Sequence, residues 1–326
     1  MSGRPVLDRF RLLAAVLVVC IHTGPLASFT EAGDFWLTRV LARVAVPFFF
    51  MTSGYFLARS GWKNTGRFVK KSLLLYGAAV LLYLPVNWYN GGAAPLEWGR
   101  RLLTDGTLYH LWYFPAVILG VLIARNLARL GGPAALIAAG TLYLLGVGGD
   151  SWYGFAARFP AAESFYEGVF RFFSYTRNGL FFAPLLLLLG AAGKRWSSRV
   201  SLTGAILSMA LMTAEGFYVR IQGWPRHDSM YLSLPLCMVF LFSLLLEENR
   251  GEDRRARRFS ALVYLLHPLS IILVRGAAEA AGMRSLFVEN SLGHFCAVLA
   301  ATSVLALAAD GLRSWLPQRG EGPPGF

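Results

Sequence analysis

Charged side chains are scarce in this sequence of 326 residues, of which 15% are Asp, Glu, Lys or Arg and 56% are hydrophobic. A soluble globular chain carries about 25% charged residues, and no long polar stretch separates the apolar runs here. These proportions exclude a large soluble domain and indicate an all-α, polytopic integral membrane protein. The net charge of +13 does not indicate nucleic-acid binding, because the basic residues cluster in short loops between apolar runs.

Cysteine is equally scarce, since only Cys20, Cys237 and Cys296 occur, each within an apolar run. An odd number without metal-ligand spacing excludes a disulfide framework and a zinc site, so we expect three small apolar core residues. The common motifs of soluble enzymes are also missing, because the sequence contains no P-loop, no GxSxG and no zinc signature. We therefore expect no metal and no permanently bound cofactor.

Ten apolar segments approach the length of about 20 residues that a membrane-spanning helix needs. Loops after the even-numbered segments are rich in Lys and Arg, so the positive-inside rule predicts that both termini are cytoplasmic. We expect one transmembrane domain over 1–316, a disordered cytoplasmic tail over 317–326, and an outer interfacial segment or lid over 150–176. The ten segments are 7–28, 36–58, 69–89, 109–129, 132–149, 177–193, 199–219, 229–247, 259–279 and 291–312.

The first predicted span carries ionisable residues, which are costly in a bilayer and persist mainly where they face protein or water. Arg11 and His22 are separated by about three helical turns, which places them on one stripe about 16 Å apart along the axis. Asp8 lies one turn before Arg11, within pairing reach. The imidazole of His22 is therefore a candidate proton acceptor, although a hydrogen bond between helices is the simpler role.

Further polar residues are predicted near the outer leaflet, where they could line a cavity that opens to the outside. A structural role is an open alternative for several of them: Arg43 as an interfacial arginine, Glu215 as the partner of Arg220, and the run 226–231 as ordinary loop polarity. The candidate binding residues of this group are Arg43, His110, Trp112, Arg177, Asn178, Glu215 and His227.

Three other features of the predicted spans and loops leave two interpretations each. Pro268 removes a backbone donor from the ninth span, so His267 could satisfy the freed carbonyl group or belong to a site. Gly54, between Ser53 and Tyr55, allows close approach of a helix or a ligand, which favours a packing point over a nucleophile. The basic loop at 59–71 is a topology signal that could also attract a nucleotide-bearing donor.

Several runs, spread in order over nearly the whole chain, resemble the acyltransferase type 3 family of integral membrane proteins. These runs are LDRFRLLAAVLVVCIHT, RVAVPFFFMTSGYFL, YHLWYFPAVILGVLIA, YTRNGLFFAPLLLLLG and VYLLHPLSIILVR. The chain is most similar to the membrane half of the membrane-bound serine racemases of vancomycin-resistance clusters, in GDFWLTRVLARVAVPFFFMTSGYFL, RHDSMY and VENSLGH.

The resemblance implies a ten-helix protein that moves an acyl group, often acetyl, from cytoplasmic acyl-CoA to a hydroxyl acceptor such as a cell-envelope sugar. It implies that His22 is the catalytic residue, as a base or as an acyl carrier, and that Arg11 binds the donor or assists catalysis. The residues expected to contact substrates then also include Asp8, Ser53, Tyr55 and His267.

The likeness to racemases implies an alternative, which is uptake or binding of an amino acid, L-serine, without acyl chemistry. We expect no racemase half and no pyridoxal phosphate site here, because the only lysines lie in or beside predicted inner loops: Lys63, Lys70, Lys71 and Lys194. The expected partners are acyl-CoA, a small-molecule or cell-envelope acceptor and the lipid bilayer. The expected location is the bacterial plasma membrane, and the sequence does not define an oligomeric state.

Overall fold

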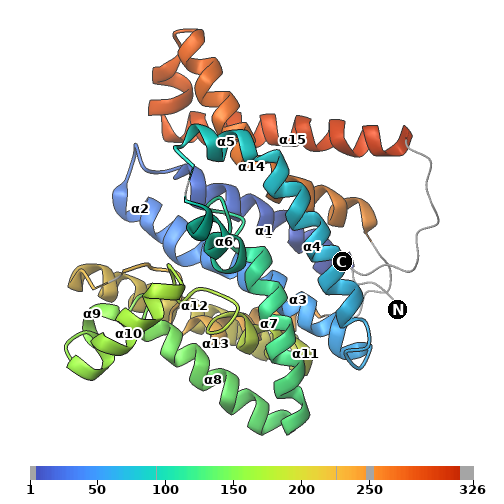
Figure 1. The fold of residues 1–326 in the computed structure, drawn as a ribbon, viewed down its shortest axis with the longest axis vertical. Coiled ribbons are helices and arrows are strands. Elements are labelled where there is room, and N and C mark those ends of the chain that lie inside the picture. The colour runs from blue at the N-terminus through green and yellow to red at the C-terminus, as the bar shows by residue number, and fades with distance from the viewer. Residues whose placement is uncertain (1–4, 93, 225, 247–252, 316–326) are drawn as a thin grey trace. The chain divides into compact units, whose positions relative to one another are not determined.

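The computed structural model describes residues 5–92, 94–224, 226–246 and 253–315, and within these ranges the chain forms helices and turns but no strand (Figure 1). This confirms the all-α prediction for the described residues, and each of the ten predicted spans contains an α-helix. Five stretches are long and apolar enough to cross a membrane, which is consistent with a membrane protein. They are Glu31–Arg59, Tyr113–Leu130, Ser198–Gln222, Arg254–Ala280 and Ser291–Leu312. The number of spans and the sides of the termini stay predictions, and the predicted tail at 317–326 lies outside the described residues.

The helices divide into two compact units along the chain. Unit 1 comprises 1–48 and 244–326, and its elements are α1 (Pro5–Thr23), α2 (Glu31–Phe35), the π-helix η1 (Trp36–Val40), the 3₁₀-helix η2 (Leu41–Val44), α14 (Arg254–Ala280), the π-helix η4 (Ser285–Glu289) and α15 (Ser291–Trp315).

Unit 2 comprises residues 49–243. Its elements are α4 (Thr65–Leu82), α5 (Leu84–Tyr89), α6 (Pro95–Thr104), α7 (Tyr113–Leu127), the 3₁₀-helix η3 (Ala128–Leu130), α8 (Gly132–Gly148), α9 (Tyr153–Ala156), α10 (Pro160–Phe172), α11 (Ala183–Ala192) and α12 (Ser198–Gln222). The boundary between the units falls within α3 (Ala45–Arg59) and within α13 (Leu234–Leu245).

Helix α1 ends at Thr23, before the predicted end of the first span at residue 28. Gly24 adopts φ +58°, a left-handed conformation that glycine reaches without strain, and Pro25 follows it. Because proline donates no backbone hydrogen bond, the helix cannot continue through this point. The predicted boundary was therefore too long by about one turn.

The second predicted span is helical throughout but irregular, since α2, η1, η2 and α3 follow one another without a break. A π-helix and a 3₁₀-helix precede Pro47, whose ring removes the amide that would bond to the carbonyl of Arg43. Such irregular turns are frequent at functional sites. Here they place Arg43 among the buried residues of unit 1, at 6% exposed.

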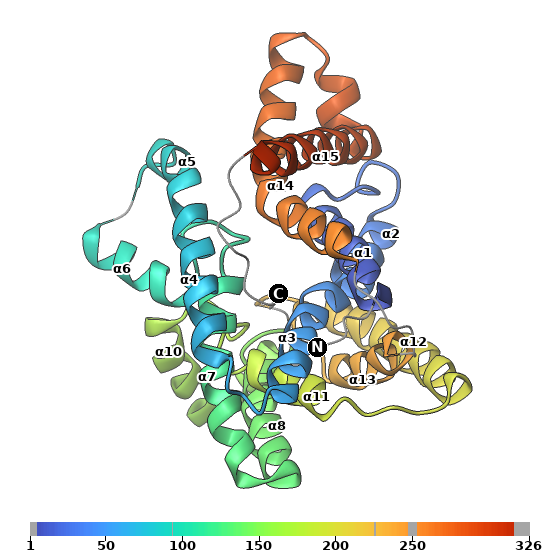
Figure 2. The same cartoon turned by 90° about the vertical axis from the view of Figure 1, so that its right-hand side faces the viewer.

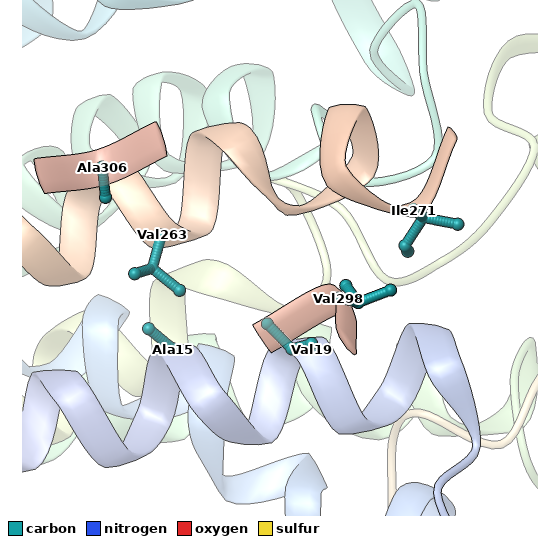
Figure 3. Packing of buried hydrophobic residues seen from close by; sticks show 6 residues of the cluster. All are labelled: Ala15, Val19, Val263, Ile271, Val298 and Ala306. Atoms are coloured by element: carbon teal, nitrogen blue, oxygen red, sulfur yellow. The ribbon is translucent and has the colours of Figure 1, made fainter. Parts of the chain in front are cut away.

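In unit 1, α1 and α14 lie side by side (Figure 2). They run in the same direction, because Asp8 contacts Asp253 at the two helix starts and His22 meets His267 further along both helices. Their shared core, together with α15, consists of Ala15, Val19, Val263, Ile271, Val298 and Ala306, which Figure 3 shows where the three helices meet. Lipid is as apolar as these side chains, so close packing rather than exclusion of water stabilises such a contact within a membrane. The parallel direction agrees with the predicted topology, in which the first and ninth spans both run outward.

In unit 2, α3 packs closely against α11 at two glycines. A Cβ atom on Gly54 would overlap the carbonyl of Leu187, and a Cβ atom on Gly190 would overlap the carbonyl of Met51. Each helix therefore offers a glycine to the backbone of the other, as in the small-residue interfaces of membrane helices. This confirms the prediction that Gly54 is a point of close helix approach.

Several predicted boundaries in unit 2 are wrong for identifiable reasons. The span 69–89 is divided into α4 and α5 before Pro85, and the span 177–193 begins as a helix only at Ala183, after the turns that Asn178 caps. The span 229–247 becomes helical only at Leu234, one residue before Pro235. The aromatic connection at 150–176 contains α9 and α10.

The three cysteines are all free thiols, as the sequence predicts. Cys20 and Cys237 are buried core residues, whereas Cys296 is exposed on α15. The prediction of three core cysteines is therefore wrong at Cys296, because an apolar run does not show which face of a helix a residue occupies.

Candidate functional site

The imidazole rings of His22 and His267 stack on each other in unit 1. Their centroids are 5.2 Å apart and their planes differ by 23°. His22 is the next-to-last residue of α1 and is partly exposed, whereas His267 lies within α14 and is fully buried. The structure thus brings together two residues that the sequence singled out separately, and one ring of the pair is accessible.

His267 also takes the role of a backbone amide in its own helix. Pro268 cannot donate to the carbonyl of Tyr264, four residues earlier, and the Nδ1 atom of His267 lies 2.8 Å from that carbonyl oxygen. Because a carbonyl oxygen only accepts, Nδ1 carries the proton and donates. The sequence left two roles open for His267, and the structure gives it both the bond to the freed carbonyl and a place beside His22.

Asp8 links the start of α1 to the start of α14. Its carboxylate accepts two hydrogen bonds from Arg257, both 3.1 Å long, and one from the amide of Asp253, also 3.1 Å long. Arg11 lies 3.3 Å from the same carboxylate, so the predicted pairing of Asp8 with Arg11 occurs. Asp8 is 2% exposed and Arg11 is 8% exposed, so a buried and a partly buried guanidinium group share one buried carboxylate.

Arg43 lies in η2 and is buried in unit 1. A snorkelling arginine at the membrane surface keeps its charged end in water, which does not match a residue that is 6% exposed. The structure therefore favours an internal role for this guanidinium over the interfacial alternative.

Four residues of unit 2 form a group that we name the aromatic–cation cluster: Trp112, Tyr175, Arg177 and His227. The guanidinium carbon of Arg177 lies 4.3 Å from the ring centre of Trp112 and 5.6 Å from that of Tyr175. Tyr175 in turn meets His227 edge to face, with centroids 5.0 Å apart. Three of the four were predicted as binding residues. Tyr175 was missed, although it stands beside them in the run YTRN.

The loop that carries His227 is held in place by Asp150, directly after α8. Asp150 accepts hydrogen bonds from the amides of Ser229 (2.7 Å) and Met230 (2.8 Å) and from the Ser229 hydroxyl (2.8 Å). Burial raises the pKa of Asp150 to about 6, although these bonds and nearby Arg177 act to lower it. The run RHDSMY is thus an anchored segment of the fold rather than ordinary loop polarity.

Asn178 and His110 have structural surroundings close to the cluster. Asn178 accepts from the amides of Leu180 (2.9 Å) and Phe181 (3.0 Å), and this cap precedes α11. His110 is 1% exposed and meets the ring of Tyr83 edge to face, with centroids 5.0 Å apart. Asn178 therefore supports the backbone before α11, and His110 belongs to the aromatic packing around Tyr83.

Glu215 on α12 is engaged by donors from two other segments. One carboxylate oxygen accepts from Trp152 Nε1 (2.9 Å) and the amide of Leu232 (2.7 Å), and the other accepts from the amide of Ser233 (2.9 Å) and from its hydroxyl. This arrangement ties α12 to the segments before α9 and before α13. It favours the structural alternative for Glu215.

Ser53 and Tyr55 flank the packed Gly54 on α3. The Ser53 hydroxyl donates to the carbonyl of Phe49 in the preceding turn, at 2.9 Å, as serines within helices often do. Tyr55 is 3% exposed, packs edge-on against Phe242, and lies 4.2 Å below the guanidinium carbon of Arg59. These contacts place the tripeptide in the packing of unit 2.

The partner that sequence reasoning missed in unit 1 is Arg257. It was only one of several basic residues in a predicted inner loop, and nothing local distinguishes it from Arg254, Arg255 and Arg258. In the part of the chain that the structure describes, no group of three His, Cys, Asp or Glu side chains is arranged to hold a metal ion.

Comparisons with known proteins identify the family of the chain. The family model described as an acyltransferase domain matches residues 4–310. The chain is 40% identical to an amino-acid racemase of Enterococcus faecalis over 95% of its own length, and 37% identical to a serine/alanine racemase of Enterococcus gallinarum over 91%. It covers 45% and 44% of those two relatives, so it spans less than half of their length. No solved structure matches the chain.

Proposed function

Because the chain belongs to the acyltransferase domain family, over residues 4–310, we propose that it is a membrane-bound enzyme that moves an acyl group from acyl-CoA to a hydroxyl acceptor. The acyl group in this proposal is acetyl, the donor is cytoplasmic and the acceptor is at the outer side of a bacterial plasma membrane. The observation that carries the proposal is the pair of stacked imidazoles, since the accessible ring, His22, lies within a helix of a chain with few charged groups.

The chemistry assigned to His22 is general base catalysis. Its ring nitrogen accepts the proton of the acceptor hydroxyl while the hydroxyl oxygen attacks the thioester carbonyl carbon. A carbon–oxygen bond forms, the carbon–sulfur bond breaks, and the proton passes from His22 to the departing CoA thiolate. In a second version of the step, the ring nitrogen attacks the thioester carbonyl carbon and the carbon–sulfur bond breaks to release the CoA thiolate. The acceptor hydroxyl oxygen then attacks the same carbon, the carbon–nitrogen bond to His22 breaks, and the hydroxyl proton passes to the thiolate.

The donor side of the proposal rests on Arg11 and its neighbours. Arg11 and Arg257 share the carboxylate of Asp8, which holds their guanidinium groups near the starts of α1 and α14. Guanidinium groups bind phosphates through paired hydrogen bonds, and acyl-CoA carries several phosphates. We therefore assign donor binding to Arg11, with Asp8 as the residue that orients it.

The acceptor side rests on the aromatic–cation cluster of unit 2. Flat aromatic faces and a guanidinium group offer both apolar and hydrogen-bonding contacts, which are typical of sites for small polar molecules. In this proposal Arg177, Trp112 and His227 contact the acceptor, while Asn178, His110 and Glu215 maintain the surrounding fold.

The decisive experiment measures turnover of labelled acetyl-CoA by the purified protein in detergent, scored as transfer or as hydrolysis. His22→Ala is expected to reduce turnover by about a hundredfold or more, as loss of a general base does. His294→Gln is the matched control, because His294 belongs to the same unit and bonds through Nδ1 to the carbonyl of Phe287. Equal turnover by wild type and His22→Ala would remove His22 from the mechanism.

A second candidate function is uptake or binding of L-serine without acyl chemistry. It is favoured by the names of the relatives, which are amino-acid racemase and serine/alanine racemase. Proteoliposomes that contain no acyl-CoA distinguish the two functions. Uptake of labelled L-serine together with no turnover of acetyl-CoA would favour transport, whereas turnover without uptake supports the acyltransferase.

A further inference from the structure

The contact between His22 and His267 joins an accessible ring to one whose orientation is fixed. The Nδ1 bond to the Tyr264 carbonyl and the complete burial of the side chain hold His267 in one place within α14. His22, by contrast, is partly exposed and is the next-to-last residue of α1, two residues before the left-handed Gly24. A side chain at a helix end has more freedom unless a neighbour restricts it.

We propose that His267 is a positioning residue for His22, whose ring it orients through the stacked contact, and that the carbonyl freed by Pro268 is what fixes His267 for this role. This inference extends the proposed function, in which His22 is the reacting group. It reassigns His267, which the sequence suggested as a substrate contact, to an indirect role.

The physical reason is that the side chain that replaces the missing backbone donor is also the ring that contacts His22. Proline in a helix leaves one carbonyl without its usual donor, which costs free energy in an apolar environment. Here the imidazole of His267 donates the missing hydrogen bond to this carbonyl. The bond fixes the planar ring in α14, where it contacts His22. Stacked rings restrict each other to a narrow range of orientations, and a general base must be aimed to accept a proton.

Two substitutions separate the hydrogen bond that His267 donates to the Tyr264 carbonyl from its stacked contact with His22. Pro268→Ala restores the backbone amide, so the Tyr264 carbonyl no longer needs the imidazole. In this background, His267→Phe keeps a flat ring beside His22 and His267→Ala removes it. A comparison of the two double variants with the Pro268→Ala parent therefore measures the stacked contact without loss of a helix hydrogen bond. Melting temperatures in detergent confirm that all three variants are folded.

The expected result is that H267A/P268A lowers kcat for acetyl-CoA turnover by about three- to tenfold, the range that corresponds to the loss of one aromatic pair, with little change in KM. H267F/P268A is expected to retain most of the kcat of the P268A parent. Equal kcat in the two double variants, or a loss that appears only in KM, would overturn the positioning role.

A second readout does not depend on acyl transfer. Diethyl pyrocarbonate modifies accessible imidazoles, and mass spectrometry of the peptide that contains His22 gives its rate of modification. Removal of the stacked ring in H267A/P268A is expected to accelerate modification of His22, and the phenyl ring of H267F/P268A to restore the parent rate. If the wild type turned over no acetyl-CoA, the proposed function would be wrong. The rate of His22 modification would still test the contact between His22 and His267. Equal modification rates would overturn the inference itself.

Discussion

Asp8 and Arg257 form a two-point ion pair between helices that are far apart in the sequence. Both guanidinium contacts are 3.1 Å long, and the Asp8 carboxylate is almost completely buried. Arg11 approaches the same carboxylate, so two positively charged side chains share Asp8 at the start of α1 and α14. This relationship gives the proposed donor site a defined framework.

Loss of this carboxylate is expected to destabilise the protein. Asp8→Ala leaves the buried guanidinium of Arg11 and the partly buried guanidinium of Arg257 without their shared carboxylate, and breaking a buried pair in this way costs about 3–5 kcal/mol. The matched control is Asp310→Ala, since the pair of Asp310 with Arg258 is largely exposed and such pairs contribute about 0–1 kcal/mol. Melting curves in detergent test the difference, and equal melting temperatures for the two variants would contradict it.

Substitution of Arg11 is expected to weaken donor binding. Arg11→Ala removes a guanidinium that can bond to phosphate. Loss of one hydrogen bond to a charged group is expected to raise the KM for acetyl-CoA by about ten- to a hundredfold. Arg9→Ala is the control on the same helix, because the Arg9 side chain is 75% exposed. A normal KM in a folded Arg11→Ala protein would exclude Arg11 from the donor site.

Substitution of Arg177 is expected to affect the acceptor and not the donor. Arg177→Ala removes the cation from the aromatic–cation cluster, and we expect the KM for the acceptor to rise by about tenfold while the KM for acetyl-CoA stays constant. Arg158→Ala serves as the control, because Arg158 lies over Trp224, outside the cluster. Parallel changes in both KM values would indicate a general structural effect.

Enlargement of Gly54 is expected to disrupt the contact between α3 and α11. A methyl group at this position meets backbone atoms of Leu187, and forced overpacking costs about 1–3 kcal/mol. Gly77→Ala is the control, since Gly77 on α4 has no atom close to the corresponding position and alanine is the better helix former. The prediction is a lower melting temperature for Gly54→Ala only, and it fails if the two variants melt alike.

The buried carboxyl group of Asp150 is expected to make stability depend on pH. Its pKa is raised from 3.8 to about 6, so the protonated form favours the folded state. The resulting stability is fully present below about pH 4 and is lost as the pH rises through about 6. Asp150→Asn keeps an oxygen for the Ser229 and Met230 amides but does not ionise.

Melting temperatures from pH 4 to 8 measure this effect. The stability of Asp150→Asn relative to wild type is expected to increase as the pH rises from 4 to 8, and the difference reaches ~3 kcal/mol at pH 8. Asp150→Ala provides the contrast, because it leaves both amides without their acceptor and should be less stable at every pH. A constant difference between wild type and Asp150→Asn would contradict the raised pKa.

Hydropathy predicted the helices well because it is a local property. Each of the ten apolar segments contains a helix, and the breaks at Gly24 and Pro25 and before Pro235 follow from backbone chemistry that the sequence displays. Long-range partners were not predictable in this way. Nothing near Arg257 shows that it pairs with Asp8, and nothing near Tyr175 shows that it lies between Arg177 and His227.

The sequence by itself determined the all-helical class, the family, and the residue types that a reaction could use, because composition, apolar periodicity and ordered motifs are properties of the chain alone. Only the tertiary structure decided that His22 meets His267, that Glu215 and Asp150 hold neighbouring segments in place, and that Arg43 is buried. The physical reason is that a helix arises from bonds between near neighbours, whereas the partner of a side chain depends on how distant helices pack.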